Sequence, residues 1–206
     1  MSSDPVKQEY ARLAGQYDSR WSFYVQATTQ ATLSRLNLHP GDRILDLGCG
    51  TGTLIQTLLQ IAPEVQVVGL DPVAEMLNLA RQKLPTAVEL KLGSATDLPF
   101  ANHSFDVLVS TSAFHYIRDP EQAIQEMQRV LKPGGRLVMT DWCYDYWTCQ
   151  LLDFWLRLFN RAHFRTYRAA QVQTLLQAAG FERVVVERYK INWLWGMMTA
   201  QALTAK

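Results

Sequence analysis

Apolar residues recur along this chain with two different periods. One-face helical spacing predicts helices over 5–19, 22–36, 53–61, 73–80, 120–131, 147–161 and 168–179. Runs that alternate or are rich in β-branched residues predict strands at 44–47, 65–71, 87–93, 104–111, 136–141 and 181–187. The residues Lys132–Gly135 contain Pro and Gly and predict a turn before the strand at 136–141. Because strands and helices follow one another in turn, we expect an α/β fold around a parallel sheet.

A glycine turn follows the first predicted strand. The strand ends with Asp46 and Leu47, and glycines then stand at 48, 50 and 52, directly before a helical pattern. Glycine tolerates unusual backbone angles and lets a ligand approach the main chain, and the helix start behind it presents free N–H groups. The spacing is G-x-G-x-G, which differs from the dinucleotide fingerprint G-x-G-x-x-G, and no Walker-type phosphate loop is present in the sequence.

A second acidic residue ends the second predicted strand. Asp71 stands about twenty residues after the glycine turn, and Pro72 then suits a first helical turn. An acid at this place accepts hydrogen bonds from ribose hydroxyls in nucleotide-binding α/β proteins. Asp46 and Asp71 together therefore predict a nucleoside-binding site at one edge of the sheet.

The run D-x-G-x-G-x-G over 46–52 resembles motif I of the class I S-adenosylmethionine-dependent methyltransferases. The resemblance implies that Asp46, Gly48 and Gly50 hold the methionine moiety of S-adenosylmethionine, with Asp46 at its ammonium. It places Asp71 at the ribose with Pro72 beside it, and Met76 under the adenine. Met76 serves equally well as an ordinary core methionine.

Other segments are similar to the ubiquinone and menaquinone biosynthesis-type members of that family. The N-terminal "YD" region places Tyr17 near the cofactor, although a plain packing helix explains it as well. The run over 93–100 resembles G-D-A-x-x-L-P-F, but Ser94 replaces the acid that contacts adenine, so that contact is expected from Ser94 or the Ala95 backbone. Thr111 ends the fourth strand on the cofactor side. The run "LKPGGRLVM" matches closely, and an antiparallel seventh strand is expected near the C-terminus.

His115 and Tyr116 follow the fourth strand, at the edge where open α/β sheets bind ligands. We expect His115 to be the candidate general base, with His163 as the next candidate, and Tyr116 to face the substrate. A structural role for this pair is the competing interpretation. No N-P-P-Y follows the strand, which counts against methylation of adenine N6 or glutamine.

Residues 142–168 are rich in aromatic side chains and are expected to form a small helical cap inserted after the fifth strand. Trp142, Tyr144, Tyr146 and His163 are its candidate substrate contacts, with a basic cluster at Arg161, Arg165 and Arg168. On the helix over 147–161, Gln150, Asp153, Arg157, Asn160 and Arg161 form a narrow polar stripe. The wide apolar arc that remains predicts a helix covered on more than one side. An aromatic packing layer with a solvated basic rim is an equal alternative to a substrate cap.

Composition limits the classes of function. The 206 residues are 48% hydrophobic with a net charge of +1, so we expect one domain over 1–206 that binds no nucleic acid. Without a signal-type segment or a long apolar run, a cytoplasmic protein without stable membrane insertion is expected. Cys49, Cys143 and Cys149 lack metal spacing and are expected to be free thiols, with no metal site. The oligomeric state stays open.

The sequence therefore predicts a Rossmann-like, seven-stranded class I methyltransferase sheet with helices on both faces and a small aromatic cap. The predicted activity is direct methyl transfer from S-adenosylmethionine to a small, apolar or aromatic molecule. A methyltransferase for macromolecules and a non-catalytic S-adenosylmethionine-binding protein are the alternatives.

Overall fold

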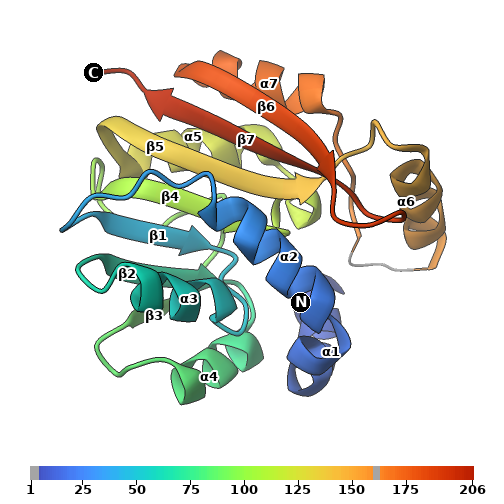
Figure 1. The fold of residues 1–206 in the computed structure, drawn as a ribbon, viewed down its shortest axis with the longest axis horizontal. Helices are drawn as coiled ribbons and strands as arrows, with labels where there is room; N and C mark the ends of the chain where they lie inside the picture. The colour runs from blue at the N-terminus through green and yellow to red at the C-terminus, as the bar shows by residue number, and fades with distance from the viewer. Residues whose placement is uncertain (1–4, 160–162) are drawn as a thin grey trace.

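The computed structural model describes residues 5–159 and 163–206. One sheet carries the strands β1 Arg43–Leu47, β2 Gln66–Asp71, β3 Glu89–Leu92, β4 Phe105–Thr111, β5 Leu131–Trp142, β6 Phe181–Lys190 and β7 Gly196–Thr204. The helices are α1 Pro5–Arg20, α2 Ser22–Leu33, α3 Thr53–Ile61, α4 Ala74–Lys83, η1 Phe114–Tyr116, α5 Pro120–Val130, α6 Trp147–Phe159 and α7 Ala169–Ala178. Figure 1 shows α1 and α6 beyond the end toward which β1 and β5 point.

The strand order is β3-β2-β1-β4-β5-β7-β6. Neighbours from β3 to β5 pair in parallel, whereas β7 runs antiparallel between β5 and β6. The predicted seven-stranded sheet with an antiparallel last strand is confirmed. Because β1 and β4 are adjacent while their sequence neighbours lie on opposite sides, their carboxyl ends mark the switch point where open α/β sheets bind ligands.

Alternate residues of the central strands enter two separate cores. Leu45 packs on the side of α5 and α7, with Ile124 and Leu176 among its buried neighbours. Ile44 packs on the other side, with Ile55 of α3 and Leu77 of α4. Both faces of the sheet are thus covered by helices, as predicted, and this explains why the parallel strands are almost continuously apolar.

The expected turn at Lys132–Gly135 is wrong in one respect, since these residues lie within β5. On the neighbouring β4, Phe105 pairs with Leu131 and Val107 pairs with Arg136. The residues of β5 between Leu131 and Arg136 are therefore accommodated as an irregularity of the strand. Gly134 has φ +72 and its N–H donates to the Ala205 carbonyl at 3.0 Å. Pairing with the end of the chain keeps the segment in the sheet despite its turn-forming residues.

The expectation that the apolar arc of α6 is covered is also wrong for the part of the chain that the structure describes. Exposed large side chains on this helix are Trp147, Leu151, Phe154, Trp155, Leu158 and Phe159. Asp153, from the predicted polar stripe, is buried instead. Its Oδ1 accepts from the Thr166 N–H at 2.9 Å and lies 2.8 Å from His163 Nε2. These contacts turn Asp153 inward, whereas Arg157 of the same stripe stays exposed. Asn160 and Arg161 of that stripe lie outside the described residues.

The three cysteines, Cys49, Cys143 and Cys149, are buried free thiols, as predicted. Among the helices of residues 5–159 and 163–206, none combines the length and apolar character needed to cross a membrane.

Candidate cofactor site

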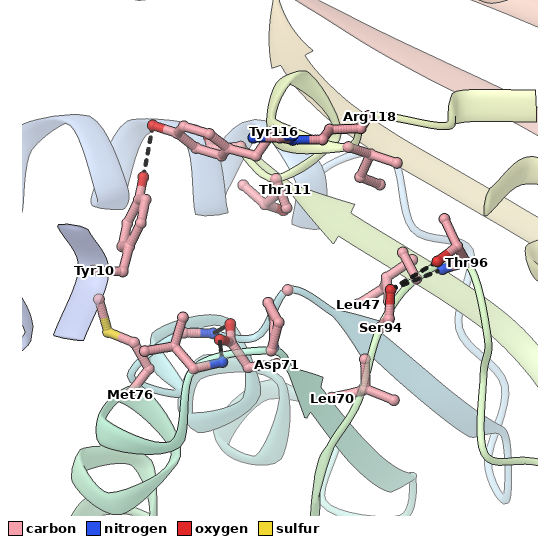
Figure 2. A pocket seen from close by; sticks show the side chains of 18 of the residues that line it. Tyr10, Leu47, Leu70, Asp71, Met76, Ser94, Thr96, Thr111, Tyr116 and Arg118 are labelled. Carbon is pink, nitrogen blue, oxygen red and sulfur yellow. Dashed lines mark hydrogen bonds between the residues drawn. The ribbon is translucent and has the colours of Figure 1, made fainter. Parts of the chain in front are cut away.

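A cavity of about 370 Å³ opens at the carboxyl ends of β1, β2 and β4. Ten of the predicted site residues line it: Tyr17, Gly48, Gly50, Asp71, Pro72, Met76, Ser94, Ala95, Thr111 and Tyr116. Figure 2 shows Asp71 and Met76 on one wall, Tyr116 on the opposite wall and Ser94 at a third side. The structure therefore brings together residues from five segments that are far apart in the sequence.

The glycine turn shapes the floor of this cavity. Gly48 has φ +78, and a Cβ there would lie 2.5 Å from the Cβ of Ala113, so the close approach of β1 and the β4–η1 segment requires glycine. Gly50 has φ +52, and its N–H donates to Asp71 Oδ2 at 2.8 Å. This hydrogen bond fixes the turn to the end of β2.

Asp71 is buried at the base of the cavity. Its Oδ1 accepts from the Val73 N–H at 2.9 Å and its Oδ2 from the Gly50 N–H. Burial raises the pKa of this carboxyl to about 6, although the two backbone donors act in the opposite direction. Each oxygen has a further lone pair, so both can accept a hydroxyl donor from a ligand.

Asp46 lies in an adjoining side pocket of about 60 Å³ whose lining includes Gly48, Gly50 and Thr111. It is 2% exposed, and no described residue hydrogen-bonds its Oδ2. Burial, and then the neighbouring charge of Asp71, raises the pKa of Asp46 to about 8. A buried carboxyl without a partner is costly, so this pocket is suited to a ligand that brings a cation or a donor.

Three tyrosines from α1 and η1 line the cavity together. Tyr10 and Tyr116 meet edge to face at 5.2 Å between ring centroids, and the Tyr10 hydroxyl donates to the Tyr116 hydroxyl at 2.7 Å. Tyr17 packs against Tyr10 at 5.8 Å. Burial raises the pKa of all three phenols, that of Tyr116 to about 12. They therefore stay neutral at physiological pH and act as apolar walls and hydrogen-bonding groups.

Several lining residues were absent from the sequence prediction. Tyr10, Ser112 and Arg118 all line the cavity. Tyr10 stands seven residues before Tyr17 on the same predicted helix, so its shared face was a usable signal. Ser112 has φ +57, a backbone conformation that cannot be predicted from a serine in the sequence.

His115 lies behind the cavity and is not among its lining residues. The backbone N–H of His115 donates to Asp141 Oδ2 at 3.0 Å, and the ring Nδ1 lies 2.6 Å from Asp141 Oδ1. Its ring lies 3.9 Å from the Tyr116 ring and stacks on Trp142 at 4.9 Å. Its Nε2 is buried, and no described residue hydrogen-bonds it.

The cap residues lie farther from the cavity. The indole of Trp142 donates to the Tyr24 hydroxyl at 2.6 Å, and the His163 ring lies 5.8 Å from the His115 ring. Tyr144 packs under the guanidinium of Arg168, and Tyr146 under the ammonium of Lys190. Trp142, Tyr144, Tyr146 and His163 are all absent from the cavity lining, and the expected contacts of the cap with the substrate stay a prediction.

Comparison with known proteins agrees with this arrangement. The model of the "Methyltransferase domain" family matches residues 45–139. The demethylmenaquinone methyltransferase of Lactiplantibacillus plantarum is 31% identical over 192 residues, covering 78% of this chain and 79% of that protein. An uncharacterized methyltransferase of Mycobacterium tuberculosis is 45% identical over 95 residues, covering 46% of this chain and 37% of that protein. The matched region thus spans little more than a third of the latter relative.

Two solved structures share the fold. A Haloferax volcanii methyltransferase, solved with the Trm112 methyltransferase activator, has a TM-score of 0.85 at 21% identity and covers 96% of this chain and 98% of that chain. Phosphoethanolamine N-methyltransferase 2 of Haemonchus contortus, in complex with S-adenosyl-L-methionine, has a TM-score of 0.76 at 16% identity. The match covers 96% of this chain and 60% of that chain. At these identities the likeness concerns the fold.

The fold and the glycine turn define a class I methyltransferase. More particularly, the chain belongs to the S-adenosylmethionine-dependent methyltransferase family that includes the demethylmenaquinone methyltransferases, and S-adenosylmethionine is its cofactor. The described residues fit this group. The cavity offers a buried acid with free lone pairs at Asp71, a glycine floor, and an unpartnered carboxyl oxygen at Asp46.

Proposed function

We propose that the chain methylates a small, largely apolar or aromatic molecule by direct transfer from S-adenosylmethionine. The observation that carries this proposal is the tyrosine wall. Tyr10, Tyr17 and Tyr116 present neutral aromatic side chains to the cavity that Asp71 also lines. Such walls favour flat or apolar ligands through burial and ring stacking.

The cofactor contacts that we propose follow the cavity from its side pocket outward. Asp46 faces the ammonium and the turn at Gly48 and Gly50 lies along the methionine moiety, with Thr111 closing that side. Asp71 accepts from the ribose hydroxyls. The further contacts are assigned to Tyr17, Pro72, Met76, Ser94 and Ala95, which line the same cavity.

When bound, S-adenosylmethionine supplies an electrophilic methyl group. The chain then has three tasks: to fix the cofactor, to hold the acceptor in line with it, and to exclude water. The buried tyrosines are unsuited to accept a proton from a carbon or oxygen acid, because a neutral phenol is a weak base. Any proton that must leave the acceptor therefore requires another group.

We propose His115 as that base. Asp141 holds its backbone N–H and its Nδ1, which leaves Nε2 as the nitrogen able to accept a proton. An imidazole oriented by a carboxylate is a common form of general base. Since Tyr116 stands between the His115 ring and the cavity, proton transfer requires Tyr116 to shift or to relay the proton.

The test is a methyl-transfer screen with labelled cofactor. The panel contains demethylmenaquinone, because a relative's name contains that substrate, and simple phenols, amines and small carboxylic acids. We expect transfer to at least one ring-bearing molecule, and slower transfer by Asp71→Ala at the same subsaturating cofactor concentration. Transfer to protein or RNA alone, with no small molecule labelled, would refute the proposal, and binding of the cofactor without any transfer would favour a non-catalytic protein.

A further inference from the structure

The exposed arc of α6 forms an apolar patch at the same end of the molecule as the cavity. Its members are Trp147, Leu151, Phe154, Trp155, Leu158 and Phe159, and Trp193 of the β6–β7 turn is exposed too. Helix α6 lies at the far right of Figure 1. Phe159 is 73% exposed and Trp147 67%. Contiguous apolar surface of this kind on a water-exposed helix indicates a binding surface.

The helix is held in this orientation by buried polar contacts. Asp153 Oδ1 accepts from the Thr166 N–H and contacts His163, while its Oδ2 pairs with Arg157 Nε at 2.7 Å. On the same inner side, Cys149 Sγ lies 3.2 Å from the Gly196 carbonyl oxygen at the start of β7. Rotating the apolar arc inward would break these contacts and expose Asp153. The outward arc is therefore specified by the chain itself.

The charges around the patch are mostly basic. Arg157, Arg165, Arg168, Arg188 and Lys190 are exposed. The acids that they meet, Asp145 and Asp153, have side chains only 17% and 3% exposed. The surface around the apolar arc thus presents positive charge to a partner. A symmetric dimer through this patch would bring like charges together, which disfavours a second copy.

We infer that α6 docks on an anionic lipid surface. A helix with Trp, Phe and Leu on one face and basic residues beside it lies in the membrane–water interface, with its apolar face among the acyl chains. Tryptophan is favoured in that layer because one end is apolar and the other can stay hydrated. With thirteen residues α6 is too short to span a bilayer, which takes about 20.

The docked orientation would bring the carboxyl edge of the sheet near the lipid. His163 contacts Asp153 of α6 and lies beside His115, whose neighbour Tyr116 lines the cavity. The patch and the cavity are thus connected through three consecutive ring or side-chain contacts. Only the link between the patch and the cavity rests on the proposed function, that is, on the apolar acceptor. Lipid binding itself needs neither cofactor nor acceptor.

The experiment is co-sedimentation of the full chain with vesicles of phosphatidylcholine alone or mixed with phosphatidylglycerol. We expect binding to the mixed vesicles that weakens with added salt. Leu158→Glu should reduce the apparent association constant at least tenfold. Ile61→Glu is the matched control, since Ile61 on α3 is 59% exposed and Leu158 60%. Arg165→Gln with Lys190→Gln should weaken binding to the anionic vesicles more than to the neutral ones.

Folding and association are checked on the same samples. Circular dichroism and melting temperature should match for Leu158→Glu and Ile61→Glu, because both side chains are exposed. Absence of vesicle binding by the parent chain, or equal binding by Leu158→Glu, would overturn the inference. A parent dimer that Leu158→Glu dissociates, without vesicle binding, would assign the patch to a second copy instead. Methyl transfer to a water-soluble acceptor is measured separately, so failure of the proposed function is distinguishable.

Discussion

Asp46 should make cofactor affinity depend on pH in a defined direction. Without a ligand, burial raises the pKa of Asp46 from 3.8 to about 8, a shift on the order of 6 kcal/mol against the charged form. The ammonium of the cofactor favours the carboxylate. Binding below pH 8 should therefore release a proton from Asp46, and affinity should increase as pH rises toward 8.

The expected size follows from the fraction of Asp46 that is already ionised. With a pKa of about 8 that fraction, and hence the association constant, rises about eightfold between pH 6.5 and 7.5. Asp71, with a pKa of about 6, is mostly ionised across this range and adds little. S-adenosylhomocysteine is the practical ligand, because it retains the ammonium and is chemically stable.

Titration calorimetry in two buffers with different ionisation enthalpies measures both the affinity and the proton released. The control ligand is 5′-methylthioadenosine, which lacks the amino-acid part and should show no such pH dependence. Asp46→Asn should remove the slope and weaken binding of S-adenosylhomocysteine. A flat affinity between pH 6.5 and 7.5, or the same slope in Asp46→Asn, would refute the reasoning.

The remaining predictions concern three other positions. Asp71→Ala should weaken cofactor binding by at least ~1.5 kcal/mol by calorimetry, since hydrogen bonds to a charged acceptor are lost; an unchanged affinity would contradict its role. Ser94→Asp should keep or strengthen cofactor affinity, because Ser94 is exposed and bonds only within its own loop in the described structure; a loss above tenfold would indicate another geometry. His115→Gln should lower turnover while cofactor affinity holds; unchanged turnover would mean a structural role.

The sheet and the cofactor side of the cavity could be predicted because local sequence determines them. The strand ending in Asp46, the glycines and the acid at Asp71 each act within a few residues of their own segment. Helix α5 could also be predicted from local sequence, since Asp119 caps its first turn by accepting from the Gln122 N–H at 3.0 Å. These features need no knowledge of distant contacts.

The cap helix could be predicted but its orientation could not, because that orientation depends on a contact across ten residues. Periodicity alone assigns the apolar arc of α6 to the interior. The hydrogen bond between Asp153 and His163 reverses this assignment. This hydrogen bond forms only when His163 packs back against α6. Tyr144 and Tyr146 likewise pack against Arg168 and Lys190, partners that no local pattern reveals.

The carboxyl edge of the sheet is built with a stability cost that the cofactor can offset. Because the pKa of Asp46 is raised on folding, the empty protein gains stability from this group below pH 4 and loses it as pH rises toward 8. Asp71 acts in the same sense up to about pH 6. A bound ammonium removes the penalty at Asp46 in the ionised state. Stabilisation by S-adenosylhomocysteine, relative to the empty protein, should therefore grow with pH over the range where the unliganded sheet edge weakens.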